Sequence, residues 1–506
     1  MERRFGALLT QQQGIIERQQ TLISELERKL DDKDREHTTQ VRKLEADVAR
    51  LTRELFGPKS EKIKVPPADR DQEPPDADEL ARRKDEAERK RRERALQRNA
   101  VLEVDDVEYP LTAAHKHCPE CGGSDFLPLP PEISNTYEYV PGRFVRRRHH
   151  RHKAACRCGS YIATATAPRK LIEGAMYGPS FAAYVVVAKC ADSIPVYRLE
   201  KRFQRLGIPV SRSTMNDLLH TAAELLERLV ARLRARIPTL DIVLADETTM
   251  RLQDRSKRGF IWVFHGFDAA TSGELVLYVF TTSRSGKTAA DVLGESTGAL
   301  ICDGYTGYNV VEDPQGRVRG GCWCHARRKM YEARASAPNE ADYVITEMRK
   351  LFRLEHEARV RGYVGTAEHH QLRNERSRPV VDKLFEWLVQ MQANVLPKGP
   401  MGIAIQYMIN QRARLELFLS DPRIPLHNNA SENRLRVVAL GRKNYLFVGH
   451  PRAGRNIAGL YSLVGSCIAN DVEPSAYLTD VLMRLRDANT DEELDALLPD
   501  RWTAPA

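Results

Sequence analysis

The chain has 506 residues, enough for about two to four domains with at least one buried core. A hydrophobic content of 42%, a mean hydropathy of −0.49 and the lack of any apolar run of roughly 18 residues exclude a protein that spans a membrane by helices. The net charge of +9 and the isoelectric point near 9.0 favour a polyanionic partner such as DNA, although many basic proteins bind none.

Residues 8–55 are predicted to form a coiled coil. Apolar residues recur at seven-residue intervals from Leu9 to Leu30, and after an 11-residue step the pattern resumes at Val41 and continues to Leu55. The stripe is narrow and its flanks are charged, which favours association between copies of the chain over packing on its own domain. The start of the chain lacks the apolar core of a secretory signal, so we expect a cytoplasmic protein.

A charged linker is predicted after this helix, which ends at Gly57-Pro58. Residues 65–79 are rich in Pro and Asp, and residues 80–98 are dense in Arg, Lys and Glu. Such a composition is typical of a solvated helix or of disorder. Acidic side chains are interleaved with the basic ones, so this segment is interpreted as solvated surface and not as a phosphate-binding face.

Two close cysteine pairs, Cys118/Cys121 and Cys156/Cys158, predict a structural zinc site. The nine cysteines are an odd number, which favours reduced thiols and a metal over a disulfide framework. The second pair has a one-residue spacer where two are usual, so free thiols remain the alternative. Between the pairs, residues 143–152 alternate apolar and basic side chains, and we expect a strand with a cationic surface that contacts the DNA backbone.

A helix, a short turn and a second helix are predicted over residues 195–219. The turn contains Gly207, and Ser211 is placed to cap the second helix. This order is that of a helix-turn-helix, although helical hairpins also occur in proteins that do not bind DNA. The polar face of the second helix would reach base edges through Arg212, Ser213 and Asn216.

A buried sheet is predicted between residues 241 and 308, where short β-branched and aromatic runs alternate with turn residues. Two of these runs lead directly into aspartates, Asp246 and Asp303. A carboxylate where a strand ends at the edge of a sheet has a rigid backbone beneath it and water in front, which is the placement that a metal site needs. The expected strands are 241–246, 260–264, 275–280 and 299–302.

Cysteines and a histidine follow the sheet, at Cys322, Cys324 and His325, and could bind a metal. The favoured interpretation is that the cysteines and Trp323 pack at a strand end, while His325 and the arginines after it face outward. Almost a hundred residues with helical periodicity come next. Their apolar faces are formed by Val344, Met348 and Leu351, and by Val381, Leu384, Phe385 and Leu388.

Glu432 opens another predicted helix and is the third carboxylate of interest. It could serve the helix dipole or pair with Arg436 four residues on, or it could belong to a polar active surface. From Asn456 to Leu485 two more helices are predicted, with Pro474 opening the second, and the final residues are expected to fray.

Three motifs, Asp303–Tyr308, Cys322–Lys329 and Asn428–Glu432, make the sequence similar to bacterial transposases of the insertion sequence 66 family. The likeness extends over nearly the whole chain. It implies a DDE transposase with a ribonuclease-H-like catalytic core, in which Asp246, Asp303 and Glu432 are the catalytic acids. It also implies double-stranded DNA, as element ends and target, as the partner in a bacterial, nucleoid-associated setting, and it suggests accessory proteins encoded by the element.

Three carboxylates suit this chemistry, because two Mg²⁺ or Mn²⁺ ions about 3.5–4 Å apart activate one oxygen and stabilise the leaving one. Asp246 would bridge both ions, and Asp303 and Glu432 would each hold one. Glu247 is turned to the opposite face by strand alternation. A non-catalytic DNA-binding repressor and a ribonuclease-H-like nuclease are the alternatives. The DNA backbone would be held by Arg434, Arg436, Arg442 and Lys443.

The sequence thus predicts a multidomain α/β protein whose ribonuclease-H-like core carries a helical insertion. The expected parts are a coiled coil (1–62), a charged linker (63–100), a zinc-binding β-rich domain (101–170), a helix-turn-helix region (171–235), the first part of the core (236–330), the helical insertion (331–420), the end of the core with C-terminal helices (421–490) and a tail (491–506).

Overall fold

The computed structural model describes most of the chain after residue 141. The described residues are 142, 144–155, 162–165, 170–171 and 176–505, without 209, 255–257, 268–272 and 313–315, together with isolated positions before residue 97. Apart from those isolated positions, the predicted coiled coil and the linker lie outside the described residues, and so do all four predicted zinc cysteines. In the described part, no helix is both long and apolar enough to cross a bilayer.

The chain divides into two compact units, of which Pro58–Ala165 is the smaller. Its described strands are β1 (Lys153–Ala155) and β2 (Ile162–Thr164), which pair antiparallel. The strand predicted over residues 143–152 is therefore wrong, since pairing in the described part begins at Lys153. Apolar alternation ends at Val145, and the exposed basic residues after it have no apolar face to bury.

The larger unit, which contains all residues from Thr166 onward, is built on a mixed five-stranded sheet with the order β5-β4-β3-β6-β7. β3 (Ile242–Arg251), β4 (Arg258–Phe267) and β5 (Glu274–Thr281) form an antiparallel meander. β6 (Gly298–Ile301) and β7 (Arg317–Gly320) continue the sheet parallel to β3. The four predicted strands are confirmed, and β7 is the strand that the sequence did not reveal.

β7 escaped prediction because two of its four residues are arginines. Both side chains are buried, at 1% exposure for Arg317 and 2% for Arg319. Arg317 donates to the carbonyl oxygens of Pro238 and Leu240, at 3.0 and 2.8 Å, so its burial is offset by hydrogen bonds. A charged strand of this kind has no apolar signature in the sequence.

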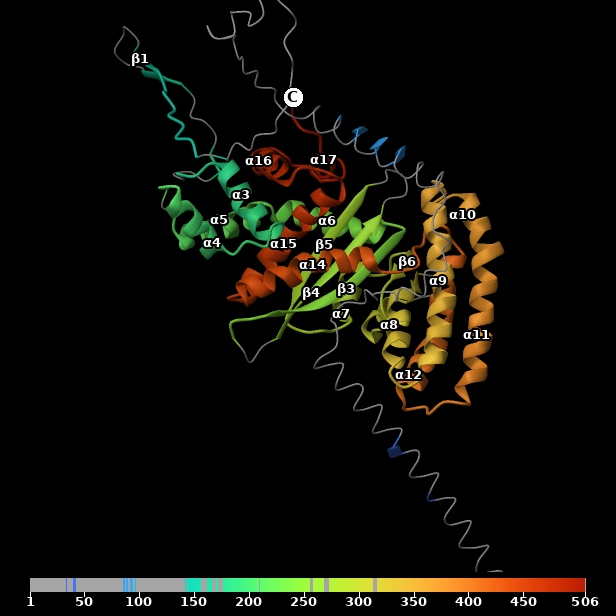
Figure 1. The fold of residues 1–506 in the computed structure, drawn as a ribbon. Helices are drawn as coiled ribbons and strands as arrows, with labels where there is room; N and C mark the ends of the chain where they lie inside the picture. The colour runs from blue at the N-terminus through green and yellow to red at the C-terminus, as the bar shows by residue number, and fades with distance from the viewer. Residues whose placement is uncertain are drawn as a thin grey trace, which may run out of the picture. The chain divides into compact units, whose positions relative to one another are not determined.

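One face of the sheet packs against a layer of helices (Figure 1). Ile242, Leu244, Ala299 and Ile301 project into this core, where Trp323 joins them. The apolar faces predicted over residues 344–351 and 381–388 are buried there, as expected. The helices of this layer are α8 (Trp323–Ala333), α9 (Pro338–Val360), α10 (Ala367–Leu372), α11 (Arg378–Gln392), α12 (Pro400–Asn410) and α13 (Arg412–Glu416).

The remaining helices lie on the side of the sheet formed by β3, β4 and β5 (Figure 1). Ser211 caps α5 by accepting a hydrogen bond from the backbone N–H of Thr214 at 3.1 Å, as the sequence predicted. The turn between α4 and α5 contains Gly207 at φ +72°, a conformation that favours glycine. These helices are α3 (Pro179–Cys190), α4 (Val196–Arg205), α5 (Arg212–Leu225), α6 (Glu227–Arg236), α14 (Asn429–Tyr445), α15 (Pro451–Ala469), α16 (Pro474–Arg484) and α17 (Asp491–Ala496). A short 3-10 turn (Ile237–Thr239) and a seven-residue helix, α7 (Lys287–Leu293), complete the unit near the sheet.

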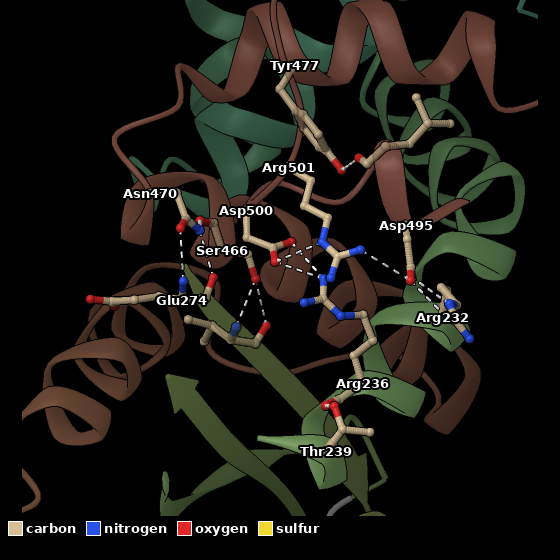
Figure 2. A network of polar contacts seen from close by, with 12 residues as sticks. Arg232, Arg236, Thr239, Glu274, Ser466, Asn470, Tyr477, Asp495, Asp500 and Arg501 are labelled. Atoms are coloured by element: carbon tan, nitrogen blue, oxygen red, sulfur yellow. Dashed lines mark hydrogen bonds and ion pairs between the residues drawn. The ribbon is translucent and has the colours of Figure 1, made fainter. Parts of the chain in front are cut away.

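Helix α15 completes the hydrogen bonding of β5, which is an edge strand. The backbone N–H of Val276 donates to Ser466 Oγ, and that of Tyr278 donates to Ser462 Oγ, both at 2.8 Å. Asn470 accepts from the backbone N–H of Glu274 at 2.9 Å (Figure 2). Because these three side chains recur every four residues on α15, one helix face substitutes for a missing strand and closes the edge to other chains.

Replacing Ser466 with alanine is expected to lower the free energy of unfolding by about 1–3 kcal/mol, since a buried backbone N–H loses its acceptor. Ser420→Ala is the matched control, because the Ser420 hydroxyl is exposed and bonds only to its own turn. Chemical denaturation of both variants measures the difference. Equal stability of the two would show that the α15 face does not stabilise the edge of β5.

The C-terminal residues form a docked helix, so the expected frayed tail is wrong. α17 begins at the capping residue Thr490, and Asp500 beyond it is buried against α6. Arg236 donates to Asp500 at 2.8 Å, and Arg232 donates to Asp495 at 2.6 Å (Figure 2). The acidic C-terminus is ordered because the basic face of α6, more than 250 residues earlier, supplies its partners.

Candidate active site

The register of the sheet brings Asp246 and Asp303 together. β3 and β6 run parallel with Leu244 opposite Ile301, which is the last pair of their ladder. Each aspartate lies two residues beyond that pair, so both come to the same face of the sheet edge. The expectation that Asp246 ends its strand is wrong, since β3 continues to Arg251 along its antiparallel partner β4.

Asn428 places the third carboxylate beside this edge. Its side chain is fully buried and donates from Nδ2 to the carbonyl oxygen of Ala245 at 2.8 Å. Its Oδ1 accepts from Ser431 Oγ at 2.6 Å, which fixes the first turn of α14. Glu432 stands in that turn. The helix start is therefore tied to the residue that precedes Asp246. Asn428 belongs to the motif Asn428–Glu432, but no sequence pattern indicated its role.

The three carboxylates interact electrostatically. Burial, the adjacent Glu247 carboxylate, and the charges of Asp303 and Glu432 raise the pKa of Asp246 to about 7. Burial also raises the pKa of Glu432. Its Oε1 is buried and has no hydrogen-bond partner among the described residues. An acidic cluster with a buried carboxylate oxygen that lacks a hydrogen-bond partner among the described residues fits a divalent metal ion.

Glu247 points away from this cluster and has partners of its own. Its Oε1 accepts from Arg284 Nε at 2.8 Å, and its Oε2 accepts from the Tyr308 hydroxyl at 2.7 Å. The side chain is 2% exposed. This placement agrees with the predicted alternation along the strand, and it makes Glu247 a rigid support behind Asp246.

Arg319 holds the turn that carries Asp303. Its Nη2 donates to the carbonyl oxygens of Asp303 and Tyr305, at 2.5 and 2.8 Å. The Asp303 Oδ1 in turn accepts from the backbone N–H of Tyr305 at 2.9 Å. No sequence pattern pointed to this residue, because an arginine in a short charged strand has the pattern of exposed surface.

His325 faces Glu432, so the expectation that it points outward is wrong. Its Nδ1 lies 3.6 Å from Glu432 Oε1. Trp323 is buried as predicted and donates from Nε1 to the carbonyl oxygen of Leu415 at 2.8 Å. His325 follows two residues later, about 200° around the helix, and therefore turns from the core toward α14. Burial opposes its protonation, yet interaction with Cys322 and the charges of Glu432 and Asp303 raise the pKa of His325 to about 9.

The predicted DNA-binding residues differ in their surroundings. Arg436 and Lys443 are exposed on α14. Arg434 pairs with Glu274 at 3.4 Å, and Arg442 donates to the Thr249 carbonyl oxygen at 2.6 Å. The guanidinium groups of Arg434 and Arg442 thus have partners within the protein. They would have to break these contacts to bind phosphate.

The residues predicted to read bases, Arg212, Ser213 and Asn216, are all exposed on α5. Arg212 forms an ion pair with Glu200 of α4 at 2.9 Å. Their contact with DNA stays a prediction, and so does zinc binding by Cys118, Cys121, Cys156 and Cys158.

Known proteins resemble this chain along most of its length. Residues 174–456, more than half of the chain, match the family described as Transposase IS66 family. Residues 462–499 match the IS66 C-terminal element, and residues 115–159 match the zinc-finger binding domain of transposase IS66, a range that contains both cysteine pairs.

Two curated relatives come from Sinorhizobium fredii (strain NBRC 101917 / NGR234). The uncharacterized protein y4qI is 31% identical over 396 residues, which cover 75% of this chain and 73% of the relative. The uncharacterized protein y4hP is 29% identical over 418 residues, which cover 78% of this chain and 74% of the relative. On these matches, the chain belongs to the IS66 family of transposases.

Proposed function

We propose that this protein binds the ends of an insertion element and catalyses metal-dependent DNA cleavage and strand transfer at Asp246, Asp303 and Glu432. In a member of a transposase family, the β3–β6 register and the hydrogen bond from Asn428 to Ala245 support one site for these three carboxylates. They are separated by 57 and then 129 residues, so their meeting is not a consequence of local sequence.

The topology supports a ribonuclease-H-like core. An antiparallel meander of three strands is followed by two strands parallel to the first, in the order β5-β4-β3-β6-β7. In this arrangement the first and fourth strands in chain order are neighbours. Asp246 and Asp303 come from those two strands, which gives a rigid platform for two of the three acids.

The chain's own residues would hold and position the metal ligands. Asp246, Asp303 and Glu432 would bind Mg²⁺ or Mn²⁺, whose Lewis acidity would activate the attacking oxygen and stabilise the leaving one. Asn428 fixes Glu432 relative to β3, and Arg319 fixes the backbone around Asp303. Pre-organisation of this kind lowers the cost of assembling a charged site.

DNA binding is assigned to three parts of the chain. The zinc-finger match over residues 115–159, the exposed face of α5 and the exposed Arg436 and Lys443 all offer polar or cationic groups. A net charge of +9 supports contacts to several phosphates. Self-association through residues 8–55 would bring two element ends into one complex.

The test uses the full-length protein and the DNA that flanks its gene. End-specific binding is expected without divalent metal, and joining of cut ends to a second duplex is expected with Mg²⁺ or Mn²⁺ and not with EDTA. An unrelated duplex of equal length is the control. If the protein binds the ends but joins no strands with either metal, the alternative of a non-catalytic repressor is favoured. If it cleaves RNA, or cleaves both duplexes equally, the alternative of a nuclease is favoured.

A further inference from the structure

A second set of metal donors lies against the carboxylate cluster. α8 begins with Cys322, Cys324 and His325, and its first turn meets the first turn of α14 at Glu432. One ligand atom each from Cys322, His325 and Glu432 lies within 4.8 Å of the other two. A thiol, an imidazole and a carboxylate therefore converge on one point, from two helix starts that are more than 100 residues apart.

The spacing of these atoms is close to that of a tetrahedral metal site. Metal–sulfur bonds of about 2.3 Å and metal–nitrogen or metal–oxygen bonds of about 2.0–2.2 Å place neighbouring ligand atoms roughly 3.3–3.7 Å apart. His325 Nδ1 and Glu432 Oε1 are already 3.6 Å apart. Both atoms are buried and lack a hydrogen-bond partner among the described residues. Two orphaned polar atoms aimed at each other leave a position that a cation would satisfy.

The support around the thiol also suits a metal ligand. The backbone N–H of Asn428 donates to Cys322 Sγ at 3.3 Å, which orients the sulfur and favours its thiolate. Cys324 hydrogen-bonds with Cys322 and is only partly buried. Cys324 is not among the three donors that lie within 4.8 Å of one another, so a water would complete four ligands.

The donor set distinguishes this site from the one proposed for Mg²⁺. Sulfur and imidazole ligands select zinc-class ions, whereas Mg²⁺ takes oxygen ligands and retains water. We propose that Cys322, His325 and Glu432 form a binding site for a zinc-class divalent ion, with a water as the fourth ligand. Its ligands are other residues than the cysteine pairs at residues 118–121 and 156–158.

Glu432 belongs to both sites, and this has a consequence that rests on the proposed function. One carboxylate cannot complete the zinc-class site and hold the catalytic Mg²⁺ as well without sharing its oxygens. A zinc-class ion at Cys322 and His325 would draw Glu432 away from Asp246 and Asp303. The protein would then keep its hold on DNA but join strands more slowly, until the ion was removed.

The test is a Co²⁺ titration of the full-length protein without DNA and without Mg²⁺. Sulfur-to-cobalt charge-transfer absorption reports only ions that are bound by thiolate, so Co²⁺ at carboxylates alone does not contribute. Cys322→Ala is compared with Cys467→Ala, which removes another buried thiol, on α15, that belongs to no group of metal donors among the described residues. Both variants keep the four cysteines at residues 118–158, whose contribution cancels in the comparison.

Cys322→Ala is expected to lose about one thiolate-bound Co²⁺ per chain relative to Cys467→Ala. If Cys322→Ala fails to fold by circular dichroism, His325→Asn replaces it, with an expected weakening of Co²⁺ affinity by about tenfold or more. Identical titrations of the folded variant and its control would overturn the proposal. Because no DNA is present, that result is distinct from a failure of strand joining, which concerns the proposed function alone.

Discussion

Asp303→Asn is expected to reduce strand joining by about a thousandfold or more, because weakened metal binding removes several kcal/mol of transition-state stabilisation. Binding to element-end DNA should stay close to that of the unchanged protein. The substitution is conservative in shape, and the Asn Oδ1 can still accept from the Tyr305 backbone N–H that now bonds Asp303 at 2.9 Å. The turn held by Arg319 is therefore preserved, and the change is one of charge.

The measurement pairs a joining assay with a gel-shift assay on the same DNA. Asp291→Asn is the matched control, because Asp291 is exposed on α7 and lies outside the carboxylate cluster. Its joining rate is expected to equal that of the unchanged protein. Joining by Asp303→Asn at the control's rate would remove Asp303 from the site. A loss of joining together with a loss of DNA binding would point to misfolding.

Asp246→Asn is expected to stabilise the metal-free protein by up to about 4 kcal/mol at pH 8. Burial and the neighbouring carboxylates raise the pKa of Asp246 from 3.8 to about 7, so the folded state binds this proton more tightly than the unfolded state does. As pH rises from 3.8 toward 7, the unfolded chain ionises the group first, and the folded protein loses stability. Above pH 7 the ionised Asp246 carboxylate destabilises the folded state by the full amount, and below pH 3.8 this destabilisation is absent.

Thermal or urea unfolding in EDTA at pH 8 and at pH 4 measures this effect. The stabilisation by Asp246→Asn should shrink at pH 4, because the folded state is then protonated and the unfolded state, with a pKa of 3.8, is only partly ionised. Mg²⁺ should stabilise the unchanged protein more than the variant, since it offsets the charge that asparagine removes. An Asp246→Asn variant no more stable than Asp291→Asn at pH 8 would show that Asp246 is not under electrostatic strain. Catalytic groups commonly carry a cost in stability of this kind.

The sequence predicted those elements whose signal is local. Apolar β-branched runs located four strands of the sheet, and helical periodicity located the buried faces of α9 and α11. The capping serine Ser211 marked the start of α5. Each of these features depends on residues that are neighbours in the chain, so the sequence alone is enough to predict it. β7 could not be predicted in this way, because its arginines are buried by partners distant in sequence.

For the candidate site, the sequence by itself determined which acids to consider and, through family motifs, that Asp246, Asp303 and Glu432 belong to one set. The proposal that they form one site rests on the β3–β6 register and on the hydrogen bond from Asn428 to Ala245, both of which are tertiary contacts. The same holds for His325, whose direction follows from the burial of Trp323. The sequence specifies the chemistry of each side chain, whereas the contacts of that side chain are set only when distant segments pack together.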